Sequence, residues 1–170
     1  MAFRAGASLA ILALLALSIP AAAIEAPKVS IDSLSKLTVP PHPYDETANA
    51  SAVVDAAFAK ARAEHKRVLI DLGGNWCPDC RILAGMMELP EMRSFLEAHY
   101  VLVSVDVGRV NKNLQVPAKF GITQRLEGVP SVLVADPDGK LLDAGHVAAL
   151  ADARSMTPQG IADWLAQWAQ

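Results

Sequence analysis

Apolar residues along the chain follow two spacings, which predict a helix and two strands in its first half. In the run TANASAVVDAAFAKARAEHKR, the apolar residues Val54, Phe58 and Ala61 recur at the spacing of an amphipathic helix. The run VLIDLGG, from Val68, is largely apolar and ends at glycines, which is typical of a strand buried on both faces. The run VLVSVDV, at 101–107, predicts a second strand.

Further helices and a hairpin are predicted around and beyond these strands. CRILAGMMEL predicts a helix that ends at Pro90, PEMRSFLEAHY a second helix, and NKNLQVPAKFGI a short helix or turn. VPSVLVADPDGKLLDAGHV contains two β-rich runs around the turn sequence at 136–139, which predicts a hairpin. TPQGIADWLAQWAQ predicts a last helix with Thr157 as its N-cap and Pro158 as its first residue.

This order of elements predicts an α/β fold. Strands separated by helices pair in parallel, and the final hairpin adds an antiparallel edge. We therefore expect a central mixed sheet with helices on both faces.

The N-terminus has the pattern of a secretory signal peptide at 1–23. A positive charge at Arg4 precedes an apolar run from Leu9 to Ile19, then Pro20 and three alanines that fit a cleavage site. An uncleaved membrane anchor is the alternative, but the run is well short of the about 20 residues that a spanning helix needs. No cysteine lies near the cleavage site to carry a lipid. We expect an exported, periplasmic protein that does not span the membrane once processed.

The exported chain divides into a leader and one domain. Residues 24–46 contain four prolines and no sustained period, which predicts a leader or linker with one short strand. The domain is expected to occupy 47–170. Loss of Arg4 with the signal peptide changes the net charge from −3 to −4. This mild acidity, without a Lys/Arg cluster, does not support nucleic acid as a partner.

The stretch DLGGNWCPDCR, at 71–81, holds both cysteines of the chain, Cys77 and Cys80. A disulfide between them would close a very short loop and would add little stability. Cys77 is expected just after a strand, at the start of a helix, where unpaired N–H groups and the helix dipole favour a thiolate. Cys80, one helical turn later, is close enough to attack a mixed disulfide on Cys77.

The residues around the cysteines are expected to tune this chemistry. Pro78 is tolerated in the first helical turn, Arg81 adds a positive charge, and Asp79 adds a negative charge that opposes the Cys77 thiolate.

Metal binding and inert core thiols are the other interpretations of the pair. A structural zinc site needs four ligands, and the four histidines show no matching spacing. A carrier of a soft metal such as Cu(I) would need a third ligand, for which His146, Met86 and Met87 are the only candidates. A thiol peroxidase would want a lone cysteine in an electropositive pocket. No metal site and no cofactor are predicted.

The motifs WCPDC after a strand, GVPSVLV about fifty residues later and a D-x-x-G-x turn resemble the thioredoxin superfamily from about Thr47 to the C-terminus. The two helices after the motif, followed by VLVSVDV, are similar to the C-terminal domain of bacterial membrane thiol:disulfide interchange reductases. The resemblance implies a thioredoxin-like fold and protein-disulfide oxidoreductase activity. The resemblance implies that Cys77 is the nucleophile, that Cys80 is the resolving cysteine and that Asp71 transfers the proton. It also implies that the substrate contacts Trp76, Val129 and the cis-proline Pro130.

The sequence also departs from ordinary thioredoxins. The dipeptide between the cysteines is Pro78-Asp79 instead of Gly-Pro, and Gly85 stands where thioredoxins commonly have a kinking proline. Two insertions, at 123–127 and 146–156, are expected to reshape the substrate surface.

The charge of Asp79 is expected to raise the pKa of Cys77, which favours a reducing pair. The chain has no flavin or nicotinamide motif, so a membrane electron donor is implied, with disulfides of other exported proteins as targets. A disulfide donor or isomerase of the same fold, and a copper-binding module, remain the alternatives.

Overall fold

A three-stranded sheet lies at the centre of the computed structural model, which describes residues 24–170. The predicted signal peptide at 1–23 lies outside these residues. Strand β1 (Arg67–Gly73) lies between β2 (Tyr100–Asp106) and β3 (Ser131–Ala135), parallel to β2 and antiparallel to β3. The predicted mixed sheet is therefore confirmed.

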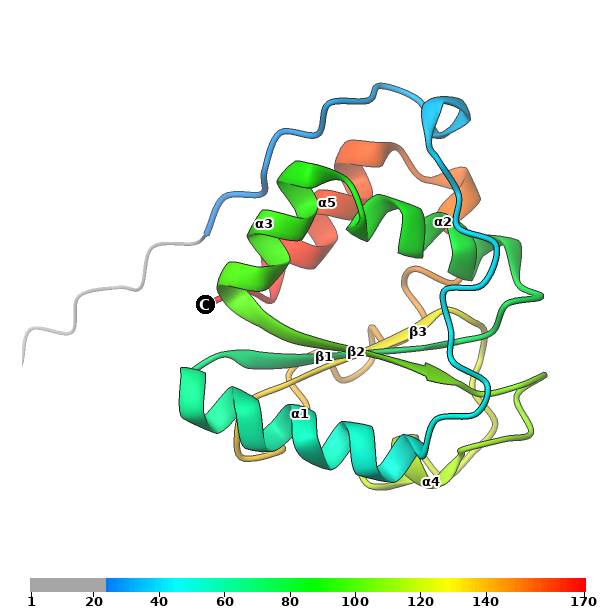
Figure 1. Cartoon of the computed structure of the whole chain (residues 1–170), viewed down its shortest axis with the longest axis vertical. Helices are drawn as coiled ribbons and strands as arrows, with labels where there is room; N and C mark the ends of the chain where they lie inside the picture. Colours follow the sequence, from blue (N-terminus) through cyan, green and yellow to red (C-terminus); the bar gives the residue numbers. More distant parts are fainter. Residues whose placement is uncertain (1–23) are drawn as a thin grey trace, which may run out of the picture.

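Helices cover both faces of this sheet, as Figure 1 shows. Helix α1 (Ala50–Glu64) and the short α4 (Gln115–Ala118) lie on one side. Helices α2 (Pro78–Met87), α3 (Pro90–His99) and α5 (Pro158–Gln167) lie on the other. None of the described helices is long and apolar enough to cross a bilayer.

The buried side chains of β1 join two apolar clusters. Val68, Ile70 and Leu72 pack in the cluster that contains α1, and Leu69 packs with residues of α2, α3 and α5. Burial of each such side chain contributes about 1.5–3 kcal/mol relative to its exposure. Because successive strand residues point to opposite faces, Asp71 shares the face of Leu69, on the α2 side of the sheet.

The last helix begins as the sequence predicts. The Thr157 hydroxyl accepts a hydrogen bond from the Gly160 N–H at 3.0 Å, and Pro158 is the first helical residue.

The predicted hairpin forms only in part. The turn at 136–139 is present, but the residues after it make a single bridge, Ala135 to Leu141, instead of a strand. The reason lies at Asp143, whose buried carboxylate accepts from the Val134 N–H at 3.0 Å, where a neighbouring strand would supply a carbonyl. The next backbone contact, from Val132 N to the Val147 carbonyl, comes only after an irregular segment.

The segment at 24–46 packs against the domain and contains a 3-10 turn, η1 (Leu34–Lys36), in place of the expected strand. It runs past α3 and α2 before it reaches α1 (Figure 1). The Val29 N–H donates to the Gln159 side chain at 3.2 Å, and Arg81 Nε donates to the Pro40 carbonyl at 3.0 Å.

Gly85 marks the closest approach of this segment to α2. A β-carbon at Gly85 would lie 2.8 Å from the Thr38 carbonyl oxygen and 3.1 Å from the Leu37 side chain. In an unhindered helix, alanine in place of glycine would add up to about 1 kcal/mol of stability. We expect Gly85→Ala instead to lower the free energy of unfolding by about 1–3 kcal/mol, because the backbone must shift. Urea unfolding checks this; equal or greater stability of the variant would contradict the close packing.

Candidate active site

The two cysteines lie where β1 ends and α2 begins. Cys77 is the N-cap of α2, and its Sγ accepts a hydrogen bond from the Cys80 N–H at 3.2 Å. Its own N–H donates to the Gly74 carbonyl at 3.0 Å, which closes the loop between strand and helix. Cys77 is 3% exposed and Cys80 is fully buried. The sulfur of Cys77 therefore satisfies one of the free N–H groups of the helix terminus.

The two thiols differ strongly in acidity. Hydrogen bonding by the Cys80 thiol, assisted by the Cys80 backbone N–H, lowers the pKa of Cys77 to about 7 against the effect of burial. Asp79 acts in the predicted direction and raises this pKa, but the hydrogen bonds outweigh it. The hydrogen bond to Cys77 and burial both raise the pKa of Cys80. Near neutral pH Cys77 is therefore partly ionised, whereas Cys80 keeps its proton.

The loop before β3 faces the cysteines. The peptide bond between Val129 and Pro130 is cis, and the Val129 carbonyl accepts from the Cys77 thiol at 3.3 Å. Trp76 lies beside the pair with 45% of its surface exposed. Its ring is held by a 2.7 Å hydrogen bond from Nε1 to the Gly108 carbonyl and by the Arg109 guanidinium, 4.9 Å from the ring centroid.

Asp71 lies behind Cys80, and its carboxyl group is fully buried. The Tyr44 hydroxyl donates to Asp71 Oδ2 at 2.7 Å, while Oδ1 has no partner within residues 24–170. Burial raises the pKa of Asp71 to about 7, although the Tyr44 hydrogen bond works in the opposite direction. An acid with this pKa exchanges protons readily at neutral pH.

Gly73 leaves the space in which these groups meet. A β-carbon there would lie 2.3 Å from the Tyr44 hydroxyl and 2.9 Å from Cys80 Sγ, so the two atoms are no more than 5.2 Å apart. A side chain at Gly73 would displace the tyrosine.

Asp79 is paired, although it lies between the cysteines in sequence. It is 5% exposed, and both of its carboxylate oxygens accept hydrogen bonds from Arg154, which lies in the 3-10 turn η2 (Ala153–Ser155). Burial opposes the charged carboxylate, but the hydrogen bonds and charge of Arg154 hold the pKa of Asp79 below its ordinary value. Pro78 is exposed in the first turn of α2, and Arg81 is the residue that contacts Pro40.

Two residues of this site, Tyr44 and Arg154, were not found from the sequence. Tyr44 stands in a proline-rich stretch that predicted only a leader, and Arg154 in an insertion without a recognisable motif. Neither stretch carries a local signal of its distant partner.

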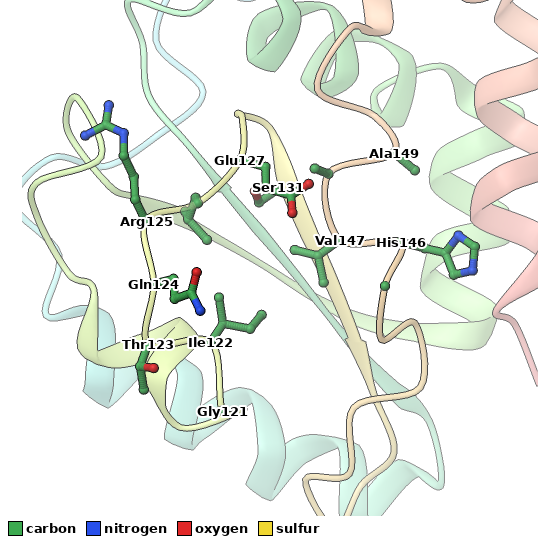
Figure 2. A pocket seen from close by; sticks show the side chains of 13 residues that line it. Gly121, Ile122, Thr123, Gln124, Arg125, Glu127, Ser131, His146, Val147 and Ala149 are labelled. Atoms are coloured by element: carbon green, nitrogen blue, oxygen red, sulfur yellow. The ribbon is translucent and has the colours of Figure 1, made fainter.

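Both insertions line one groove, shown in Figure 2, with a volume of about 580 Å³. Residues 121–127 form one wall and 145–149 the other, with Ser131 of β3 between them. The first wall is followed in sequence by Gly128 and by Val129, whose carbonyl contacts Cys77. Across residues 24–170, no three His, Cys, Asp or Glu side chains are grouped to hold a metal ion.

Residues 49–137, just over half of the chain, match a protein family described as thioredoxin-like. The chain belongs to the thioredoxin-like family. Its fold also resembles the crystal structure of a disulphide isomerase from Xylella fastidiosa Temecula1, with a TM-score of 0.67 and 36% sequence identity. That match covers 73% of this chain and 94% of the isomerase.

Two curated proteins match parts of the chain. A thioredoxin of Alicyclobacillus acidocaldarius subsp. acidocaldarius is 36% identical over 70 residues, which are 41% of this chain and 62% of the thioredoxin. Thiol:disulfide interchange protein DsbD 1 of Pseudomonas aeruginosa is 34% identical over 91 residues, which are 52% of this chain and 14% of that protein. The chain therefore spans less than two thirds of either relative.

Replacement of Tyr44 by Phe tests the contact with Asp71. Loss of the hydroxyl removes the hydrogen bond that favours the carboxylate, so the pKa of Asp71 should rise above about 7. The titration midpoint of Asp71 can be measured by carboxyl carbon NMR of the reduced protein across pH 5–9, which extends about two units on either side of that pKa.

The matched control is Tyr100→Phe, at the other tyrosine of the chain, which is buried and donates to the Leu165 carbonyl. The control should leave the Asp71 midpoint unchanged. Equal midpoints in both variants and the parent protein would contradict the assigned hydrogen bond.

Proposed function

We propose that this protein is a thiol:disulfide oxidoreductase that reduces disulfides of other exported proteins. The observation that carries the proposal is the asymmetric dithiol: Cys77 ionises near pH 7 at the start of α2, and Cys80 stays protonated and buried behind it. Such a pair supplies one nucleophile for attack and one thiol for release.

The reaction has two exchange steps. The Cys77 thiolate attacks one sulfur of the substrate disulfide, so a Cys77–substrate disulfide forms and the other substrate sulfur leaves as a thiolate. Cys80 then loses its proton and attacks Cys77 Sγ, which expels the second substrate sulfur. Two electrons pass to the substrate, and Cys77 and Cys80 end as a disulfide. The two substrate sulfurs end as thiols after they take up the proton released by Cys80 and one proton from water.

Asp71 is proposed to take the proton of Cys80 in the second step. Its pKa of about 7 suits proton transfer at neutral pH, and its negative charge raises the pKa of Cys80. The Tyr44 hydroxyl is bonded to Asp71 and lies no more than 5.2 Å from Cys80 Sγ, so it holds the acid beside the thiol.

Substrate contact is assigned to Trp76, Val129 and Pro130. Trp76 offers an exposed aromatic surface beside Cys77, and the Val129 carbonyl already lies within hydrogen-bond distance of the attacking sulfur. An extended substrate segment is proposed to contact these residues and to continue into the groove of Figure 2.

The acidity of Cys77 supports a reductant. A pKa of about 7 for the first cysteine is typical of thioredoxin, whereas about 3.5 is typical of a strong oxidant. A reductant outside the cytosol needs electrons, and we propose that a membrane donor supplies them. The similarity to part of a protein named thiol:disulfide interchange protein supports such a partnership.

Isomerase or disulfide-donor activity is the second candidate. It is favoured by the likeness to the Xylella fastidiosa protein, which is named a disulphide isomerase.

Replacement of Cys80 by Ser should trap the protein on its substrates. Without the second thiol the Cys77–substrate disulfide has no internal route to release, so disulfide-linked complexes should accumulate on non-reducing gels. The control Cys77→Ser should trap nothing. A copper carrier would instead lose metal affinity in both variants without forming complexes.

The reduction potential of the Cys77–Cys80 couple separates the two candidates. We expect a value near or below about −230 mV in glutathione buffers, as for reductants of this family. A value above about −150 mV would mean that the protein donates disulfides.

A further inference from the structure

Asp79 is held by Arg154 through several hydrogen bonds across a large separation in sequence. The backbone N–H of Arg154 donates to Oδ1 at 3.0 Å, and Nε donates to Oδ1 at 2.9 Å and to Oδ2 at 3.0 Å. A terminal guanidinium nitrogen also contacts Oδ2. The Arg154 side chain is 55% exposed, but the carboxylate that it binds is buried, so this pair is less screened by water than a pair on the open surface.

The segment that supplies Arg154 is the second insertion, 146–156. Its 3-10 turn η2 packs against α2, the helix that carries Cys77, Asp79 and Cys80. The backbone bond from Arg154 fixes the turn to Asp79, and the guanidinium then covers the carboxylate. The insertion therefore reaches the dipeptide between the two cysteines.

Charge explains why this contact matters for the sulfur chemistry. Asp79 disfavours the Cys77 thiolate, and Arg154 places an opposite charge on Asp79. The hydrogen bond and charge of Asp79 are the main causes that raise the pKa of Arg154, and the Cys77 thiolate acts in the same direction.

We propose that Arg154 is a positioning residue of the redox site, whose ion pair with Asp79 offsets the carboxylate charge and so stabilises the reduced protein. This inference rests on the proposed function, because it assigns a residue that sets the potential of the same couple. It also assigns a role to the second insertion, which supplies Arg154 to the redox site.

Several other titratable groups face Cys77, and all of them stay in place in the variants below. They are Tyr44 from the N-terminal segment, Asp71 from β1 and Cys80 from α2. Asp152 lies beside Arg154 and also stays in place. A difference between variants therefore isolates the Asp79–Arg154 pair.

The test compares the redox equilibrium of the parent protein and Arg154→Gln with glutathione at pH 8 and pH 6. At pH 8, above the pKa of Cys77, loss of the guanidinium should disfavour the thiolate and make the protein more reducing. We expect a roughly threefold change in the equilibrium constant, or about 14 mV, since tenfold corresponds to 29.6 mV. At pH 6 Cys77 is a thiol in both proteins, so the difference should vanish.

Three further variants make the test specific to charge. Asp79→Asn should shift the equilibrium in the opposite direction at pH 8, and the double variant Asp79→Asn/Arg154→Gln should return close to the parent value. Arg154→Lys should shift it less than Arg154→Gln does. The matched control Arg62→Gln removes an arginine that contacts Pro137 on the surface and should change nothing.

The outcomes separate this inference from the proposed function. The role of Arg154 would be overturned if Arg154→Gln left the equilibrium constant with glutathione unchanged at pH 8, or changed it equally at both pH values. In either case the Cys77–Cys80 couple would still be reversible. If Arg154→Gln does not fold, Asp79→Asn decides: no shift at pH 8 would overturn the inference. Absence of any reversible couple in the parent protein would instead overturn the proposed function.

Discussion

The hydrogen bond from the Cys80 N–H to Cys77 Sγ, at the first turn of α2, is the contact around which the site is organised. It makes the sulfur the cap of a helix, where an anion is favoured by the free N–H groups and the dipole. The contact exists because β1 ends at Gly73 and a short loop delivers Cys77 to the helix start. The same geometry buries Cys80, so the two thiols take opposite protonation states.

Two aspartates show how environment divides the roles of one residue type. Asp71 is buried with a neutral tyrosine as its partner, and its pKa rises to about 7. Asp79 is almost as buried, but a guanidinium faces it and holds it ionised. Burial therefore sets the pKa of Asp71, whereas at Asp79 the hydrogen bonds and charge of Arg154 outweigh burial.

Both partners come from segments outside the sheet and its principal helices. The segment at 24–46 brings Tyr44 to Asp71 across the α2 side of the molecule, and the segment at 146–156 brings Arg154 to Asp79. The second segment follows the residues of the missing hairpin strand, where the Asp143 carboxylate takes over one strand hydrogen bond. Two irregular segments, one before α1 and one before α5, thus complete a site whose centre is regular.

The sequence by itself determined the order of helices and strands, the helix start at Thr157 and the place of the cysteines between β1 and α2. These follow from local periodicity, caps and turn residues, which act over a few positions. The second hairpin strand was predicted wrongly. Local β-propensity does not reveal that the Asp143 carboxylate accepts the Val134 N–H hydrogen bond that a neighbouring strand would otherwise accept. Only the tertiary structure decided the contacts of Tyr44 and Arg154, which are 27 and 75 residues from their partners. Their partners are chosen by packing across the fold, and no short-range pattern encodes that choice.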